Sequence, residues 1–217
     1  MKSLRQEIIP LLENYLPQTR IEHSIRVAET AHQMAVSGTN LYGQALDPKD
    51  AYKAGLLHDI AKALSPNKLC DLGIAQSPWY SSLHTKYPAV WHAFAAPRLI
   101  ETLWGVHPPE ILQAIRYHTT GAANMGILAK ILYIADYIEP ERPFHDRQIV
   151  MNMVIKNRQS IEDIHLALAI IVSGSIIGLS RRQKAIHPLT LHCYNAISSK
   201  LTAPSLSRCK LHIANYY

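Results

Sequence analysis

The chain has 217 residues, of which 48% are hydrophobic, and its formal net charge at pH 7 is +6. This length fits one large domain or one domain with appendages, and the positive charges are too dispersed to predict a nucleic-acid surface. Three distant cysteines, Cys70, Cys193 and Cys209, argue against a disulfide framework or zinc ribbon, so we expect a cytoplasmic protein.

Apolar residues recur at spacings of three and four along most of the chain, which predicts helices. The few glycines, and the prolines at segment boundaries, are typical of helix ends rather than of regular β-turns. The sequence contains no convincing alternating strand. We therefore expect an all-α fold, with helices at about residues 3–15, 18–37, 48–62, 66–73, 88–104, 109–118, 126–139, 146–156, 160–180 and 188–200.

Three segments along this path need separate interpretation. Asp47 before Pro48 is typical of a helix start, because aspartate caps the backbone and proline suits the first helical position. The aromatic, serine-rich segment Ser77–Pro88 is interpreted either as a loop over a functional site or as core packing by its aromatic residues. Ile164–Leu179 is the most apolar stretch, but it is too short for a membrane span and contains His165, so we expect a buried helix and no membrane.

The most informative feature is an adjacent His58-Asp59 pair at the end of the apolar run Gly55-Leu-Leu. Burying an unpaired imidazolium or carboxylate is costly, so such a pair requires a partner that offsets the cost. A divalent metal is the usual partner. Histidine nitrogen combined with aspartate oxygen suits iron, manganese or zinc.

Four more residues lie in similar apolar, helix-like stretches and are candidates to complete the site: His23, His92, His118 and Asp136. Each has an ordinary alternative when it is considered alone. A single histidine on an apolar face is more often a hydrogen-bonded core residue, and an aspartate in a helix is more often solvated or a cap. The order of the motifs is what favours a metal site over these alternatives.

Four sequence words occur in a fixed order: Arg20-x-x-His23-Ser24-x-Arg26-Val27, Gly55-Leu-Leu-His58-Asp59-Ile-Ala-Lys62, Ala114-Ile-Arg-Tyr-His118-Thr-Thr-Gly121 and Ala135-Asp136-Tyr-Ile-Glu139-Pro140. This series resembles the HD-domain metal-dependent phosphohydrolases, and in particular the bacterial YqeK family. The resemblance runs from about Leu16 to about Leu191 and includes Ile186-His187-Pro188. It implies a helical HD-domain bundle, which we assign to residues 1–198, and leaves residues 199–217 as a tail of unknown role.

The chain departs from the family pattern at one place. Family members commonly have His-Gly-Pro where this chain has His92-Ala-Phe94, so the histidine is kept and the residues after it differ. We therefore expect a different local backbone and a different substrate fit near His92.

The resemblance also implies roles for the candidate residues. His23, His58, Asp59 and Asp136 would hold one metal, most readily iron, with manganese or another divalent transition metal as alternatives. His92 and His118 would be ligands of a second metal or would bind phosphate directly. If two metals bind, Asp59 is the natural bridge, because a carboxylate has two oxygens. The sequence leaves one or two ions open.

Several residues beside these ligands are candidates for substrate binding. We assign Lys62 and Asp59 to catalysis. Lys62 would act as a point charge that binds phosphate; the alternative is that Lys62 is an ordinary exposed surface lysine. Arg20 lies three residues before His23 and could bind phosphate with its guanidinium.

The sequence leaves open the roles of the residues that follow His118, of Arg26 and of Glu139. Thr119, Thr120 and Gly121 could donate hydrogen bonds to phosphate or could end a helix. Arg26 could pair with Glu22, four residues away on a helix. Glu139 is interpreted either as a partner that orients a metal ligand or as a residue at a helix end.

The function implied by the resemblance is metal-dependent hydrolysis of diadenosine tetraphosphate to two ADP, by a symmetrical bis(5'-nucleosyl)-tetraphosphatase. The alternatives are another nucleotide phosphohydrolase of the HD superfamily, or a non-catalytic nucleotide-binding HD module. The expected partner is a nucleotide substrate, together with a second copy of the chain in a homodimer. Neither nucleic acid nor membrane is expected as a partner.

Overall fold

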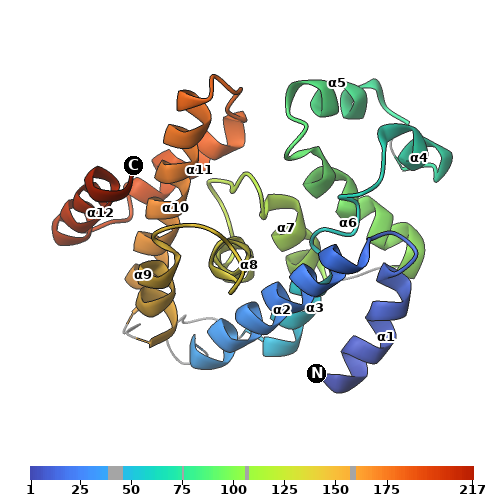
Figure 1. Ribbon diagram of the computed structural model, residues 1–217, viewed down its shortest axis with the longest axis horizontal. Helices are drawn as coiled ribbons and strands as arrows, with labels where there is room; N and C mark the ends of the chain where they lie inside the picture. Colours follow the sequence, from blue (N-terminus) through green and yellow to red (C-terminus); the bar gives the residue numbers. More distant parts are fainter. Residues whose placement is uncertain (39–45, 75, 106–107, 157–159) are drawn as a thin grey trace.

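The computed structural model describes residues 1–38, 46–74, 76–105, 108–156 and 160–217, and within these ranges it contains helices and no strand (Figure 1). The all-α prediction is therefore confirmed for this part of the chain. The helices are α1 (Lys2–Leu12), α2 (Gln18–Gly38), α3 (Pro48–Leu57), α4 (Pro66–Asp71), α5 (Pro78–Lys86), α6 (Trp91–Trp104), α7 (Pro109–Tyr117), α8 (Ile127–Ile138), α9 (Arg147–Met151), the π-helical turn η1 (Asn152–Lys156), α10 (Ile161–Arg181), α11 (Pro188–Ser198) and α12 (Ala203–Tyr216).

Helix α8 is the centre of the packing, and Figure 1 shows it end-on in the middle of the molecule. It packs against α2, α3, α7 and α10, and most of its side chains are buried, from Leu128 to Ile138. The sequence of α8 contains few polar residues because it has neighbours on several sides. Asp136 lies near its carboxyl end, and this position carries a carboxylate into the middle of the helix bundle.

Helices α2 and α3 approach each other closely at Gly55. A Cβ atom added to Gly55 would lie 2.4 Å from Ala28 Cα and 2.7 Å from Ala28 N. No side chain fits at that distance, so glycine permits the backbone contact. The contact fixes the end of α3, where His58 and Asp59 follow, against the middle of α2, which carries His23.

Some element boundaries differ from those predicted, because local capping signals were stronger than the periodicity. The segment expected to be irregular at 77–88 contains α5, whose start is capped by Ser77 Oγ accepting from Trp79 N at 3.3 Å, with Pro78 at the first position. Helix α3 ends at Leu57 rather than near residue 62, since residues 58–63 form turns. The cap predicted at Asp47 is confirmed, with Asp47 Oδ1 accepting from Lys49 N at 2.8 Å.

The last helices form a second layer on α10. Helices α11 and α12 both pack against α10, so the chain after residue 198 is helical and attached to the rest of the fold. Thr202, which caps α12, donates from N and Oγ1 to Glu162 Oε1 at 3.1 and 2.5 Å. Helix α10 is long and apolar enough to cross a membrane by length and composition, but half of its apolar window is buried inside the protein, as in a core helix.

Candidate metal centre

Five helices bring the predicted ligands together at one point inside the bundle. His23 lies in α2, His58 and Asp59 follow α3, His92 is the second residue of α6, His118 caps α7, and Asp136 lies in α8. All are buried except Asp136, which is partly exposed. The six residues span 113 positions of the sequence, from His23 to Asp136, but they meet in space, so the fold itself assembles the cluster.

Asp59 lies at the centre of this cluster, with each carboxylate oxygen facing a different pair of histidines. Oδ1 is 3.0 Å from His92 Nε2 and 3.5 Å from His118 Nε2. Oδ2 is 3.7 Å from His58 Nε2 and 3.9 Å from His23 Nε2. This arrangement is compatible with a carboxylate that contacts one ion or lies between two.

Two groups of three residues have the mutual distances of a metal site. The first is His23, His58 and Asp136, and the second is His58, Asp59 and His118, with all candidate ligand atoms of a group within 4.8 Å of one another. His92 lies next to the second group, since its Nε2 is 3.2 Å from His118 Nε2. The structure thus brings all six predicted ligands together.

Backbone contacts of two histidines determine which ring nitrogen faces the cluster. His58 Nδ1 lies 2.7 Å from Gly55 O, and His118 Nδ1 lies 2.7 Å from Ile115 O. A carbonyl oxygen only accepts, so Nδ1 of each ring must carry the proton and donate. In the neutral form of each ring, Nε2 is then the acceptor and is directed at the cluster, and this is the form that binds a metal.

The donor atoms fit a divalent metal. His58 Nε2 is buried and has no hydrogen-bond partner among the residues that the structure describes, and the buried His23 Nε2 faces the Asp136 carboxylate, 3.1 Å from its Oδ1. Buried polar atoms are rarely left without a partner, because each costs free energy. Imidazole nitrogen and carboxylate oxygen together are ligands for iron, manganese or zinc, so a bound ion would satisfy these atoms.

The protonation states around the cluster also suit a metal. Burial lowers the pKa of His58 to about 4 and that of His92 to about 3, so both imidazoles are neutral at pH 7. Burial raises the pKa of Asp59, but His58, His118 and His92 outweigh this effect and lower it well below its usual value. Burial likewise opposes ionisation of Asp136, whereas His23 and Arg142 lower its pKa. Neutral histidines and ionised carboxylates are the ligand forms that metals require.

A group of interactions outside the ligands orients His23. His23 Nδ1 is 3.2 Å from Glu139 Oε1, and Glu139 Oε2 accepts from Arg26 Nε at 2.8 Å. The proposed pairing of Arg26 with Glu22 is wrong, because Arg26 instead binds Glu139 and, through Nη2, Glu141 at 2.9 Å. Glu139 therefore lies where the sequence interpretation placed an orienting partner.

Cationic side chains surround the carboxylates. Arg20 Nη1 donates to Asp59 Oδ2 at 3.2 Å, and Lys62 Nζ lies 3.2 Å from His92 Nε2 and 3.5 Å from Ala89 O. Arg142, which the sequence reasoning missed, donates from Nη2 to Asp136 Oδ1 and from Nε to Asp136 O. No sequence motif indicated this role for Arg142. Pro140 lies between Asp136 and Arg142, and the two side chains meet only because the chain turns back after this proline.

The three residues after His118 differ in which of their hydrogen-bonding groups already have a partner in the protein. The Gly121 N–H donates to Tyr117 O at 2.8 Å, and Gly121 has a φ of 65°, so it ends α7. The Thr120 hydroxyl is buried and donates to Gly121 O at 2.9 Å. Thr119 Oγ1 is buried without a hydrogen-bond partner among the described residues, so of the two threonine hydroxyls it is the one that no protein group satisfies.

A cavity of about 510 Å³ opens beside the cluster. His118, Thr119 and Asp136 line one side of it, and Arg142 and Arg182 add positive charge. The rest of its lining combines aliphatic and small residues with four aromatic side chains, Tyr133, Tyr137, Phe144 and Tyr217. This combination of cations and aromatic rings beside a metal cluster can accommodate a nucleotide.

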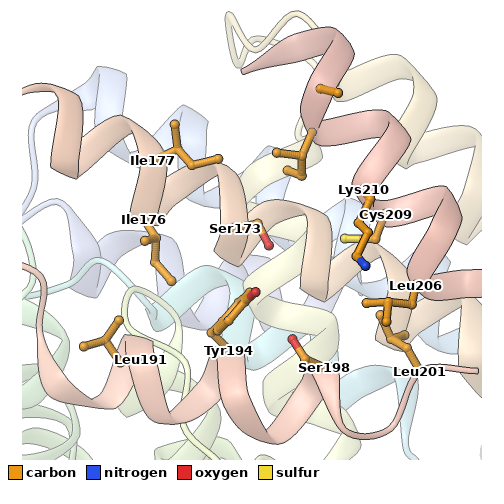
Figure 2. Close-up of a pocket in the computed structure, with 12 residues that line it drawn as sticks. Ser173, Ile176, Ile177, Leu191, Tyr194, Ser198, Leu201, Leu206, Cys209 and Lys210 are labelled. Carbon is orange, nitrogen blue, oxygen red and sulfur yellow. The ribbon is translucent and has the colours of Figure 1, made fainter. Parts of the chain in front are cut away.

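A second cavity, of about 500 Å³, lies between α10, α11 and α12 and is shown in Figure 2. Apolar side chains such as Ile176, Leu191 and Leu206 surround it, with Lys210 at its edge. It contains none of the predicted site residues, so the chemistry lies with the cavity beside Asp136.

Comparison with known proteins agrees with this geometry. The profile of the HD domain matches residues 20–141. A Bacillus subtilis protein, "Bis(5'-nucleosyl)-tetraphosphatase, symmetrical", is 30% identical over 90% of this chain and 98% of its own length. A Halalkalibacterium halodurans protein of the same name is 32% identical over 89% of this chain and 96% of its own length. A Clostridium acetobutylicum structure, described as a "predicted HD superfamily hydrolase involved in NAD metabolism", has a TM-score of 0.76 and 30% identity, covering 90% of this chain and 97% of its own.

Proposed function

The chain belongs to the HD domain family, and from this premise we propose that it hydrolyses diadenosine tetraphosphate symmetrically into two molecules of ADP. The observation that carries the proposal is the buried cluster in which the Nε2 atoms of His23 and His58 lie beside the carboxylates of Asp59 and Asp136, with His23 Nε2 3.1 Å from Asp136 Oδ1. The name shared by relatives that are about a third identical over most of the chain supports this substrate.

The cluster would hold a divalent transition metal through His23, His58, Asp59, His118 and Asp136, with His92 beside them. We propose iron as the resident metal, because neutral imidazoles and carboxylates without a thiolate suit iron, with manganese as the alternative. The two carboxylate oxygens of Asp59 face different histidine pairs, which supports a second ion on the side of His92 and His118. Bound metal polarises a phosphoryl oxygen and lowers the pKa of water.

The residues of the chain neutralise and position the tetraphosphate. Lys62, Arg20 and Arg142 lie around the carboxylates and offset the charge of the phosphates. Thr119 Oγ1 is free to donate to a phosphate oxygen at the mouth of the cavity. The aromatic side chains of the same cavity form a surface on which a nucleobase can stack.

The reaction balances as a single hydrolysis. The oxygen of water forms a bond to one of the two central phosphorus atoms, and the bond from that phosphorus to the central bridging oxygen breaks. The bridging oxygen keeps the electron pair and leaves as part of one ADP, while the attacked half keeps the water oxygen and becomes the other ADP. The protons of the water pass to the product phosphates and to solvent. Lys62 stabilises the negative charge that develops, since its ammonium group lies beside the cluster.

The test is product analysis with purified protein loaded anaerobically with iron or manganese. We expect diadenosine tetraphosphate to give ADP as the only product. The appearance of ATP and AMP in equal amounts would reject symmetrical cleavage. Binding of the dinucleotide without turnover would favour a non-catalytic module, and faster turnover of another compound in a nucleotide panel would favour a different phosphohydrolase.

We also propose a cytoplasmic location and a homodimer. The three cysteines, Cys70, Cys193 and Cys209, are far apart in the sequence and form no CxxC pair, which supports a reducing compartment. Light scattering coupled to gel filtration measures the mass in solution, and a mass equal to one chain of 24.4 kDa would reject the dimer.

A further inference from the structure

A third cavity, of about 330 Å³, lies between α5, α6, α7 and the start of α11, and the proposed reaction does not use it. Its walls combine aromatic rings with positively charged or ionisable side chains: Trp79, Tyr87, Phe94, Lys86, Arg116 and His187. None of the residues lining it is an aspartate or a glutamate. A cavity with this composition attracts a ligand that has both a flat ring and negative charge.

The aromatic wall is built in layers on Phe94. The buried Phe94 ring lies 5.7 Å from the Trp79 ring and 5.3 Å from the His187 ring, and the His187 ring lies 4.7 Å from Tyr87. Trp79 itself is 46% exposed, so Phe94 supports a ring that still has free surface. Exposed aromatic rings held in place in this way are the surfaces on which nucleobases stack.

The positive charges converge on the same space. The Arg116 guanidinium lies 4.9 Å from the centre of the Phe94 ring, and Lys86 Nζ lies 5.4 Å from the centre of the Tyr87 ring. Burial, Arg116 and Lys86 together lower the pKa of His187, and both cations line the cavity with it. The first turn of α11, at Pro188 and Leu189, adds the positive end of a helix dipole.

This cavity is close to the metal centre but opens on another side. Phe94 and Arg116 are each two residues from a residue of the cluster, His92 and His118, which is about 3 Å along a helix axis. Residues two apart differ by about 200° in direction on a helix, so these pairs point to opposite faces. Phe94 also lies in the segment His92-Ala-Phe94, where the sequence departs from the family pattern.

We propose that this cavity is a second nucleotide site, in which Trp79 and Tyr87 contact the base and Lys86 and Arg116 bind the phosphates. The shared chemistry is that of a nucleoside diphosphate. Two sources offer it: a free nucleotide, or the far half of a dinucleotide substrate. The second source rests on the proposed function, whereas the binding itself does not.

The first test is a calorimetric titration of metal-loaded protein with ADP. We expect Trp79→Ala and Lys86→Gln each to weaken one class of ADP sites by about tenfold or more, which corresponds to the loss of one base stack or one charged contact. Two matched controls, Tyr194→Ala and Arg98→Gln, remove an exposed aromatic ring and an exposed arginine elsewhere and should leave ADP binding unchanged. Trp79 and Lys86 are both exposed, so their replacement should not disturb the core. Circular dichroism verifies that the variants fold.

Unchanged ADP binding in folded Trp79→Ala and Lys86→Gln would overturn the proposal. If the variants lose ADP binding, steady-state kinetics shows whether the natural occupant of the cavity is a free nucleotide or the far half of the dinucleotide substrate. If the far half of the substrate occupies the cavity, both variants raise KM for diadenosine tetraphosphate about tenfold and leave KM for bis(4-nitrophenyl) phosphate unchanged. If a free nucleotide occupies it, both KM values stay at the wild-type level. Failure of the protein to hydrolyse the dinucleotide would remove the proposed function, while the ADP titration would still decide the site.

Discussion

Glu139 Oε1 lies 3.2 Å from His23 Nδ1, across 116 positions of the sequence. The contact matters because the other ring nitrogen, His23 Nε2, is buried in the cluster and faces the Asp136 carboxylate, 3.1 Å from its Oδ1. A carboxylate on one side of an imidazole fixes the proton there and directs the lone pair of the other nitrogen toward a metal. Glu139 is itself held by Arg26 and by the Glu141 N–H at 3.0 Å.

The first prediction concerns this contact. Glu139→Gln removes the negative charge that orients His23, and we expect metal affinity to fall by about 10–100-fold. Competition with a chelator measures the affinity. Glu141→Gln is the matched control, since Glu141 also binds Arg26 but is exposed and does not contact His23. Equal affinity in wild type and Glu139→Gln would show that the contact does not tune the metal site.

The second prediction concerns the ligands themselves. His58→Ala and Asp136→Asn each remove one donor of the group that also contains His23, so we expect loss of bound metal. Activity should fall by at least about 100-fold, because metal stabilisation of the transition state is worth several kcal/mol. Elemental analysis and ADP production are the measurements. The control His192→Ala, at an exposed residue of α11, should retain both bound metal and ADP production. Full activity in His58→Ala would show that His58 is not part of the site.

The third prediction concerns the packing that places His58 and Asp59. Gly55→Ala inserts a methyl group 2.4 Å from Ala28 Cα, so α3 must move away from α2. Overpacking of this kind costs about 1–3 kcal/mol in the free energy of unfolding. Denaturant unfolding measures it, and metal affinity should fall as well because the following residues move. Gly126→Ala meets only a side-chain oxygen of Gln113 at 3.4 Å and should be close to neutral.

The fourth prediction concerns the attachment of the C-terminal helix. Asp146 is buried and accepts from the Tyr137 hydroxyl at 2.5 Å, and its other oxygen lies 2.8 Å from His212 Nε2 in α12. Asp146→Ala leaves both partners without this carboxylate, at a cost of about 1–3 kcal/mol. Hydrogen exchange should rise in α12 before it rises in α8. Asp71→Ala, at an exposed residue of α4, should change neither; unaltered exchange in Asp146→Ala would show that α12 is held by its apolar contacts.

The fifth prediction concerns pH and lies away from the metal cluster. Burial and the neighbouring Lys130 and Lys200 lower the pKa of His165 to about 4, and Lys130 Nζ lies 3.1 Å from His165 Nε2. Because the unfolded histidine has a pKa near 6.5, the unfolded state binds more protons between about pH 6.5 and pH 4. Stability should therefore fall as the pH falls through this range.

The comparison with His165→Gln isolates this effect from the other histidines. The variant lacks the titrating group, so its free energy of unfolding should fall less steeply between pH 6.5 and pH 4.5 than that of the wild type. One full proton corresponds to about 1.4 kcal/mol per pH unit, and because His165 is partly exposed we expect well under that value. Parallel curves for the two proteins would contradict the lowered pKa.

Much of the site could be predicted because its metal-binding residue types occur in short sequence motifs. The His58-Asp59 pair in an apolar run required an offsetting partner, and the order of the remaining ligands pointed to the HD family, which the profile match over residues 20–141 supports. Arg142 could not be found in this way. It reaches Asp136 only because the chain turns back after Pro140, and no local pattern encodes that return.

The sequence by itself determined the all-α fold and the identity of the six candidate ligands, since helical periodicity and residue chemistry are properties of neighbouring positions. Tertiary structure alone decided what each ligand faces. It directs the two oxygens of Asp59 to different histidines, and it joins Glu139 to His23. It also gathers Trp79, Phe94 and Arg116 into one cavity. These relationships depend on how helices pack, and packing is set by the whole core rather than by any local stretch of residues.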